Sequence, residues 1–242
     1  MARLIGIVPA RGGSSLARKN IRMLGLHPLL VWTLVPACDA CDLVIVTSDD
    51  EDILAVAEPY RVIRHDEPPF LASPRIGDLP VVLDALREVA LEPDDIVVLL
   101  RPTAPFRRAE EIRGVAWLLR RAHVDSVRSV VPLASHPQKS YIQFGWTNLP
   151  PDMSRAYPYL TPATERHRAN HQRQWLQPAF RACGFIDAVR ADVVVGMQSM
   201  EGDLIVGWEA PAERVVDIDS EQDFAQAAAW AAANGWRPGE VK

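Results

Sequence analysis

The chain has 242 residues, of which 48% are apolar and 24% are charged, and its formal net charge is −5. The length suits a single domain over residues 1–242, and the acidic balance gives no polybasic character for binding nucleic acid or an anionic membrane. No apolar run approaches the ~20 residues of a membrane span, and the first apolar stretch is too short for a signal peptide, so the cytoplasm is the expected location.

The apolar run at residues 4–8 predicts a buried parallel strand, which Pro9 ends because proline has no N–H for the ladder. A loop of small residues follows, with Gly12 and Gly13 at its centre. Glycines let a ligand approach main-chain N–H groups closely. Four cations flank this loop: Arg11, Arg18, Lys19 and Arg22. The pattern favours a polyphosphate site over a merely solvated surface loop, although neither the Walker spacing nor Gly-x-Gly-x-x-Gly is present.

Strands and helices are predicted to alternate through the first half of the chain. Apolar runs predict strands at 42–48, 61–64, 94–100 and 124–131. Helical spacing of apolar residues predicts helices at 28–40, 49–57, 77–91 and 109–122. This alternation is typical of a parallel sheet with helices on both faces.

Residues 132–175 break that alternation, because the segment is rich in Pro, Gln, His, Arg and aromatic residues and is too long for an ordinary connection. We interpret it as an insertion that carries acceptor contacts, a dimer arm, or both. Four apolar residues on it have little local core to fill, which favours burial in a homodimer: Trp146, Leu149, Met153 and Tyr157. Beyond the insertion, strands are predicted at 179–189, 203–208 and 212–216, and helices at 191–197 and 220–232.

Asp217 and Asp219 stand two residues apart at the end of the last predicted strand, so both side chains would leave the same face. Two carboxylates beside bound phosphates form a Mg²⁺ site that needs no full protein cage. The alternative is that Asp219 or Ser220 caps the last helix, with Asp223 completing a capping box. Capping explains one aspartate but not both.

Pro9-Ala-Arg-Gly-Gly-Ser14, followed by Arg18-Lys-Asn20, resembles the signature of the CMP-acylneuraminate synthetase family of cytidylyltransferases. The resemblance extends over residues 5–224 and includes the Asp-Ile-Asp motif. It implies a three-layer αβα sandwich with a Rossmann-like, mostly parallel sheet, and a Mg²⁺-dependent reaction of CTP with an acidic acceptor that releases pyrophosphate. The usual family loop is one residue longer and carries a lysine after the serine, which this chain lacks.

The resemblance also implies roles for single residues. Arg11 and Lys19 would be the catalytic cations, Asn20 would lie near the ribose, and Asp217 and Asp219 would hold the metal. The remaining nucleotide contacts would come from Ala10, Gly12, Gly13, Ser14, Arg64, Ala72 and Ser73. For Arg64 and the segment around Ser73, which match the family's cytosine-reading stretch, a plain solvated loop is an equal alternative from the residues alone.

The expected acceptor site departs most from the family. Arg101 replaces a glutamine and Asp187 replaces a tyrosine, whereas the family-like Lys139, Arg173 and Gln177 are retained as acceptor contacts. More guanidinium charge predicts a small phosphonate acceptor, such as phosphonoformate. The alternatives are a nonulosonic (sialic-type) acid as acceptor, a nucleotide-binding protein without turnover, and a purely structural Arg101–Asp187 salt bridge.

Overall fold

The computed structural model describes residues 2–13, 16–146, 158–162 and 172–239. It divides into two compact units. The first comprises Met1–Val130 and Ala182–Lys242, and the second comprises Val131–Arg181. Among the described residues, no helix has the length and apolar character needed to cross a membrane.

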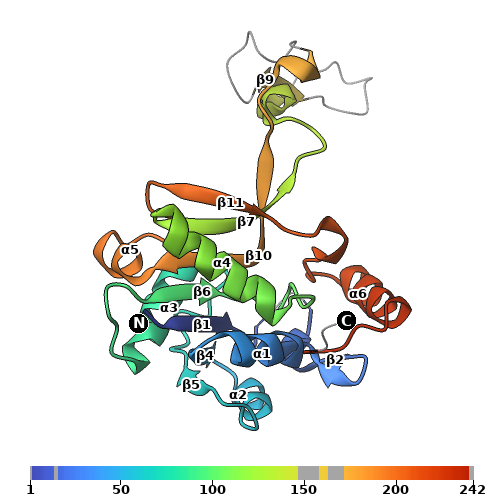
Figure 1. The fold of residues 1–242 in the computed structure, drawn as a ribbon. Coiled ribbons are helices and arrows are strands. Elements are labelled where there is room, and N and C mark those ends of the chain that lie inside the picture. Colours follow the sequence, from blue (N-terminus) through green and yellow to red (C-terminus); the bar gives the residue numbers. More distant parts are fainter. Residues whose placement is uncertain (1, 14–15, 147–157, 163–171, 240–242) are drawn as a thin grey trace. The chain divides into compact units, whose positions relative to one another are not determined.

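The first unit is built on a seven-stranded sheet with the order β11-β7-β10-β6-β1-β4-β5 (Figure 1). Its strands are β1 (Leu4–Pro9), β4 (Leu43–Ser48), β5 (Ile63–Asp66), β6 (Ile96–Leu99), β7 (Ser126–Pro132), β10 (Phe180–Arg190) and β11 (Ile205–Glu209). Strands β6, β1, β4 and β5 pair in parallel, as do β7 and β11, whereas β10 runs antiparallel to β6. The carboxyl ends of four parallel strands therefore meet at one edge of the sheet, where ligands bind in open α/β folds.

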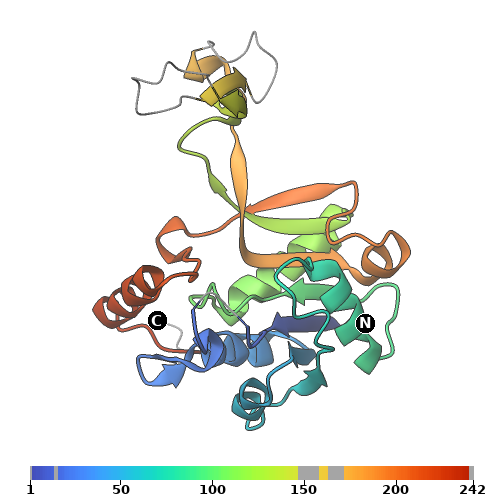
Figure 2. The same ribbon diagram turned by 180° about the vertical axis from the view of Figure 1, so that it is seen from behind.

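Helices cover both faces of this sheet. Helices α1 (Leu29–Ala40) and α4 (Ala109–Ala122) lie on the face seen in Figure 1, with α2 (Glu51–Ala57) beside α1. Helices α3 (Asp78–Ala85) and α5 (Ala191–Gly196) lie on the opposite face, seen in Figure 2. The predicted αβα sandwich with a mostly parallel sheet is thereby confirmed.

The core explains why these segments form these elements. Fully buried β-branched residues of β1, β4 and β6 pack against α3 and α5, as expected for strands covered on both sides. The strand residues are Ile5, Ile7, Ile45 and Val97, and the helix residues are Val82 and Val194. A second cluster fastens α6 (Glu221–Ala233) to α1 through Trp32, Phe106 and Phe224. The rings of Phe106 and Trp230 lie 4.6 Å apart between centroids. Ile218 is fully buried in this cluster, which fixes the backbone on either side of it.

Two predicted elements differ from the structure. The helix predicted over 77–91 ends at Ala85 and continues only as the 3-10 helix η2 (Leu86–Glu88). The strand predicted over 212–216 is wrong, because that segment begins with the 3-10 helix η5 (Ala212–Arg214) and continues as irregular backbone. Arg214 is buried there and its guanidinium pairs with Glu111, which draws the segment onto α4 instead of along the sheet.

The second unit contains an antiparallel pair, β8 (Tyr141–Trp146) and β9 (Pro158–Pro162), and the 3-10 helices η3 (Pro137–Lys139) and η4 (Arg173–Trp175). It contains the whole of segment 132–175, which the sequence marks as an insertion. Leu149, Met153 and Tyr157, three of the residues on which the dimer prediction rests, lie outside the described residues. The roles predicted for this segment in acceptor binding and dimerisation stay predictions.

Candidate functional site

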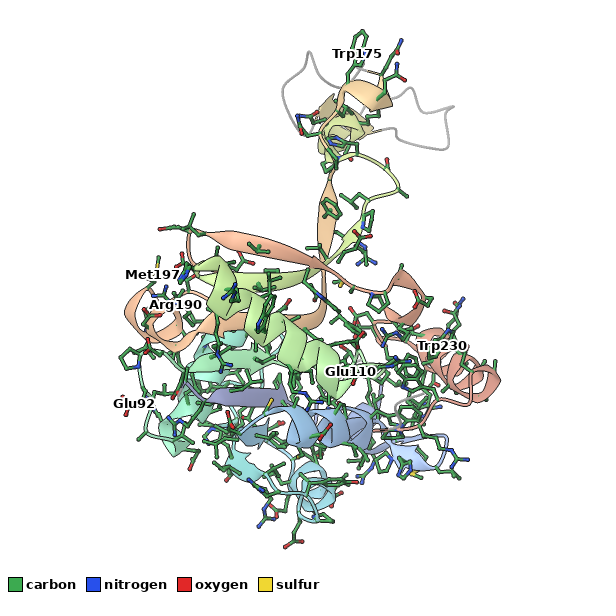
Figure 3. The ribbon with its side chains drawn as sticks, in the orientation of Figure 1. Glu92, Glu110, Trp175, Arg190, Met197 and Trp230 are labelled. Atoms are coloured by element: carbon green, nitrogen blue, oxygen red, sulfur yellow. The ribbon has the colours of Figure 1, made fainter. Side chains whose placement is uncertain are left out.

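A cavity of about 340 Å³ opens at the carboxyl ends of β1, β5 and β6 in the first unit. In Figure 3, Glu92 and Arg190 mark the opposite end of the sheet, and Trp230 marks α6 near the cavity end. The cavity brings together six of the residues that the sequence predicts: Arg11, Lys19, Asn20, Ser73, Arg101 and Asp219. Two carboxylates that sequence reasoning missed, Glu67 and Asp78, also line it.

The loop after β1 is fastened to β4 and to itself. Ala10 donates its N–H to the carbonyl of Thr47 over 2.9 Å and accepts from the Ser48 hydroxyl over 2.7 Å. The N–H of Gly12 donates to the Asp49 carboxylate over 2.7 Å, and a Cβ at Gly12 would lie 2.8 Å from the Cβ of Asp50. A side chain at Gly12 therefore has no room. Gly13 is exposed, and Ser14 lies outside the described residues.

The 3-10 helix η1 (Lys19–Ile21) supports this loop through Asn20. Asn20 is 5% exposed and donates its amide to the carbonyl of Arg11 over 3.0 Å, so it shapes the loop as well as lining the cavity. Arg11 itself forms no ion pair within the described ranges, and its half-buried guanidinium lies on the cavity wall. Arg11 is therefore available to a bound anion.

Lys19 joins the loop to the Asp-Ile-Asp motif, almost the whole chain away in sequence. Its side chain is 7% exposed, and its ammonium donates to the Ile218 carbonyl over 2.8 Å and to the Asp219 carboxylate over 3.0 Å. By contrast, Arg18 pairs with Asp52 on the surface and does not line the cavity. The structure thus unites two motifs that the sequence predicts to belong to one site.

Asp217 and Asp219 are both exposed, and Asp219 lines the cavity. Ser220 is the N-cap of α6 and forms the capping box with Asp223, so neither Asp217 nor Asp219 is the capping residue. In the part of the chain that the structure describes, no three His, Cys, Asp or Glu side chains gather into a metal cluster. Carboxylates suit Mg²⁺, a hard cation that keeps several waters and is commonly completed by substrate phosphates. Because Asp217 does not line the cavity, the shared metal site of the two aspartates stays a prediction.

The segment predicted to read cytosine is only partly at the cavity. Ser73 lines it and Ala72 is half-buried next to Ser73, but Arg64 is exposed on the edge strand β5 and does not line the cavity. Glu67 does line it and is 3% exposed. Burial raises the pKa of Glu67, against the hydrogen bond from the Thr47 hydroxyl, which lowers it. The available signal was a carboxylate just after a predicted strand, at the edge where ligands bind.

Arg101 is held by two carboxylates on the cavity wall. Its guanidinium contacts Asp187 at 3.0 Å and Asp78 at 2.5 Å. Burial opposes this charge, but the two carboxylates outweigh burial and raise the pKa of Arg101. In the β6–β10 pairing, Asp187 lies opposite Leu99. Because Arg101 follows Leu99 by two residues, its side chain can reach Asp187. The structural salt bridge considered as an alternative is therefore formed.

Asp187 is 2% exposed and does not line the cavity. It also contacts Arg128 at 3.3 Å and accepts hydrogen bonds from the N–H and hydroxyl of Ser129, each over 3.3 Å. Sequence reasoning missed Arg107, which is buried and donates to the Arg101 carbonyl over 2.5 Å. Burial and the Arg101 charge lower the pKa of Arg107 to about 9, so it stays charged at neutral pH. Both residues act on the cavity through Arg101.

The remaining predicted acceptor contacts belong to the second unit. Lys139 is exposed at the end of η3, and the carbonyl of Gln177 lies 2.8 Å from the Nε2 atom of His136. Arg173 begins η4, but its side chain lies outside the described residues. The participation of these three residues in the site remains a prediction.

Comparisons with known proteins show which sequences and structures this chain resembles. The family described as cytidylyltransferase matches residues 5–141. A CMP-N,N'-diacetyllegionaminic acid synthase of Legionella pneumophila is 34% identical over 56% of this chain and 60% of its own length. An N-acylneuraminate cytidylyltransferase of Escherichia coli is 36% identical over 46% of this chain and 26% of its own length. The chain thus covers less than two thirds of these relatives.

Solved structures show the same fold at low sequence identity. A CMP:2-keto-3-deoxy-manno-octonic acid synthetase complexed with CTP superposes with a TM-score of 0.68 at 14% identity, covering 96% of this chain and 100% of that chain. A 4-diphosphocytidyl-2C-methyl-D-erythritol synthase from Anaerococcus prevotii has a TM-score of 0.59 at 16% identity, covering 96% of each.

Proposed function

The chain belongs to the cytidylyltransferase family, as its loop motif predicts, and we propose that it transfers the cytidylyl group of CTP to an anionic acceptor and releases pyrophosphate. The observation that carries the proposal is the meeting of Arg11, Lys19 and Asp219 in one cavity. A site that only bound the nucleotide would not need a buried lysine held against an aspartate beside the loop.

The reaction is an in-line attack of an acceptor oxygen on the α-phosphorus, during which negative charge grows on the non-bridging oxygens and on the leaving pyrophosphate. Arg11, which has no ion pair in the described chain, would bind the charge that develops. Lys19 is already fixed by Ile218 and Asp219, so it loses little side-chain freedom when it meets a phosphate.

Asp217 and Asp219 would hold Mg²⁺, which when bound neutralises charge on the phosphates and orients them. Asp219 would then have two tasks, since it also pairs with Lys19. Through this shared carboxylate, a bound metal would influence the position of the Lys19 ammonium beside the phosphates.

For the acceptor, we propose a sugar acid of the nonulosonic type, in place of the small phosphonate expected from the sequence. The named relatives make CMP conjugates of such acids. The phosphonate expectation rested on added guanidinium charge, and Asp78 and Asp187 already neutralise Arg101. The extra arginine therefore adds less positive charge to the cavity than its sequence position suggests.

The test is pyrophosphate release by the full chain with Mg²⁺, crossing four nucleoside triphosphates with sugar acids, sugar phosphates and small phosphonates. We expect turnover only with CTP and a sugar acid, and its loss when EDTA removes the metal. Lys19→Met should lower kcat by about a hundredfold or more. The matched control is Arg87→Met, which removes an exposed cation paired with Asp84 and should leave the rate unchanged.

Two outcomes would contradict the proposal. Turnover with a phosphonate and not with sugar acids would overturn the choice of acceptor and keep the chemistry. Tight CTP binding without turnover across the whole panel would favour a nucleotide-binding protein, in which the missing loop lysine has removed catalysis.

A further inference from the structure

Glu67 places a buried carboxylate on the wall of the cavity. It follows β5, where its N–H donates to the Ser48 carbonyl over 2.8 Å. The Thr47 hydroxyl donates to its Oε2 atom over 3.0 Å. These two contacts with β4 fix both the backbone and one carboxylate oxygen of a residue that is 3% exposed.

The other carboxylate oxygen of Glu67 has no hydrogen-bond donor among the residues that the structure describes. No cation there pairs with it either, because the neighbouring His65 contacts Asp84 and Glu88. Only Arg108 Nε and Arg128 Nε are sealed, unpartnered polar side-chain atoms in the described chain, so this oxygen of Glu67 is not sealed off, and Glu67 lines the cavity. A ligand that brings a donor into the cavity would satisfy this oxygen.

The sheet order indicates which part of the ligand lies there. Strand β1, whose loop would hold the phosphates, has β6 on one side and β4 and then β5 on the other. Arg101 follows β6 and Glu67 follows β5, so the two residues flank the phosphate loop from opposite sides. With the anionic acceptor on the Arg101 side, the base of the nucleotide is left for the Glu67 side.

We propose that Glu67 accepts a hydrogen bond from the exocyclic amine of cytosine and thereby selects CTP over UTP. Cytosine presents an N–H donor where uracil presents a carbonyl oxygen, whose lone pairs a carboxylate repels. This assignment rests on the proposed function, since it takes CTP as the substrate. Under this assignment, base selectivity depends on Glu67, which belongs to none of the motifs identified in the sequence.

The test compares kcat/KM for CTP and UTP in the full chain and in Glu67→Gln. A glutamine can turn its amide to donate to the uracil carbonyl, so the CTP:UTP ratio should fall about tenfold to a hundredfold. Asp78→Asn is the matched control, because Asp78 is a carboxylate on the same cavity wall that faces Arg101 instead. It should leave the CTP:UTP ratio unchanged.

A fall of both rates by the same factor, or an unchanged ratio, would overturn the assignment and leave Glu67 a structural residue. Should Glu67→Gln fail to fold, Glu67→Asp draws the carboxylate back by one methylene and should bind CTP more weakly, so that the CTP:UTP ratio narrows. Calorimetric binding of CTP and UTP without acceptor separates the two proposals. If the protein shows no turnover but prefers CTP, and Glu67→Gln removes that preference, the assignment of Glu67 is upheld and catalysis is rejected. If the wild-type protein binds neither nucleotide, both proposals are rejected.

Discussion

Arg101 occupies an ambiguous position, because it lies on the cavity wall and is also paired with Asp78 and Asp187. An acceptor carboxylate can reach it by replacing Asp78, which is 43% exposed, whereas Asp187 is 2% exposed and held by further hydrogen bonds. Arg101→Gln should therefore raise the acceptor KM about tenfold to a hundredfold, the value of a hydrogen bond to a charged group, and leave the CTP KM nearly unchanged.

In the same experiment, Asp78→Asn should change the acceptor KM in the opposite direction. It removes the carboxylate that competes for Arg101, so the acceptor KM should fall by roughly threefold, as expected for an exposed ion pair. Steady-state kinetics with the acceptor varied at saturating CTP measures both variants. An unchanged acceptor KM in Arg101→Gln would mean that the guanidinium serves only the ion pair with Asp187.

Single residues of the site were predictable where a local motif carries them. Short motifs, whose chemistry can be inferred without the structure, contain Arg11, Lys19 and Asp219. All three residues line the cavity. Glu67 and Arg107 were not predictable in this way, since their roles depend on which strand ends become neighbours. A buried carboxylate beside Thr47 looks in sequence like any surface glutamate.

At the scale of elements, Asp95 ties the start of β6 to the start of β1. Its side chain is 1% exposed, accepts from the N–H of Arg3 over 2.9 Å and pairs with the Arg3 guanidinium. Burial alone would raise the pKa of Asp95, but the hydrogen bonds from Arg3 and from the N–H of Glu92 outweigh it and lower the pKa from 3.8 to about 2. Asp95 therefore stabilises the fold in its ionised form.

Because the folded-state pKa of Asp95 is the lower one, its contribution is complete above the unfolded value near 3.8 and is lost as the pH falls through about 2. Asp95→Asn should lower the free energy of unfolding by about 1–2 kcal/mol at pH 6, and the difference from wild type should shrink below pH 4. Urea unfolding across this range measures it. Asp52→Asn, in an exposed pair, should differ little at any pH, and an equal gap for Asp95→Asn at pH 6 and pH 2.5 would contradict the argument.

Whole elements were predictable in proportion to the strength of their local signals. Helix α4 has the predicted bounds, because it is strongly amphipathic, carries Glu110 and Glu111 in its first turn and ends at His123 in the left-handed conformation. The segment 212–216 was misjudged because Val216 packs on the cluster that holds α6, and the buried Arg214 pairs with Glu111 of α4. Short apolar stretches alone cannot distinguish packing on a helix from pairing with a strand.

At the scale of the whole molecule, the second unit, Val131–Arg181, is small and its only described sheet is the two-stranded β8–β9 pair. A two-stranded antiparallel pair is at best marginally stable alone in water. The sequence adds apolar residues to this unit, Trp146 and Tyr157 among them, whose side chains lie outside the described ones. Burial against a second copy of the chain would stabilise this unit, which is the physical basis of the predicted homodimer.

The full chain should therefore sediment at micromolar concentration as a species of twice 26.9 kDa. Replacing Trp146 and Tyr157 together by serine should shift it toward the monomer, since each aromatic side chain buries a large apolar area at an interface. Trp117→Ser is the matched control, because this tryptophan of α4 is 60% exposed and belongs to the first unit. A wild-type monomer would refute the dimer, and a dimer lost in Trp117→Ser alone would move the interface from the second unit to α4.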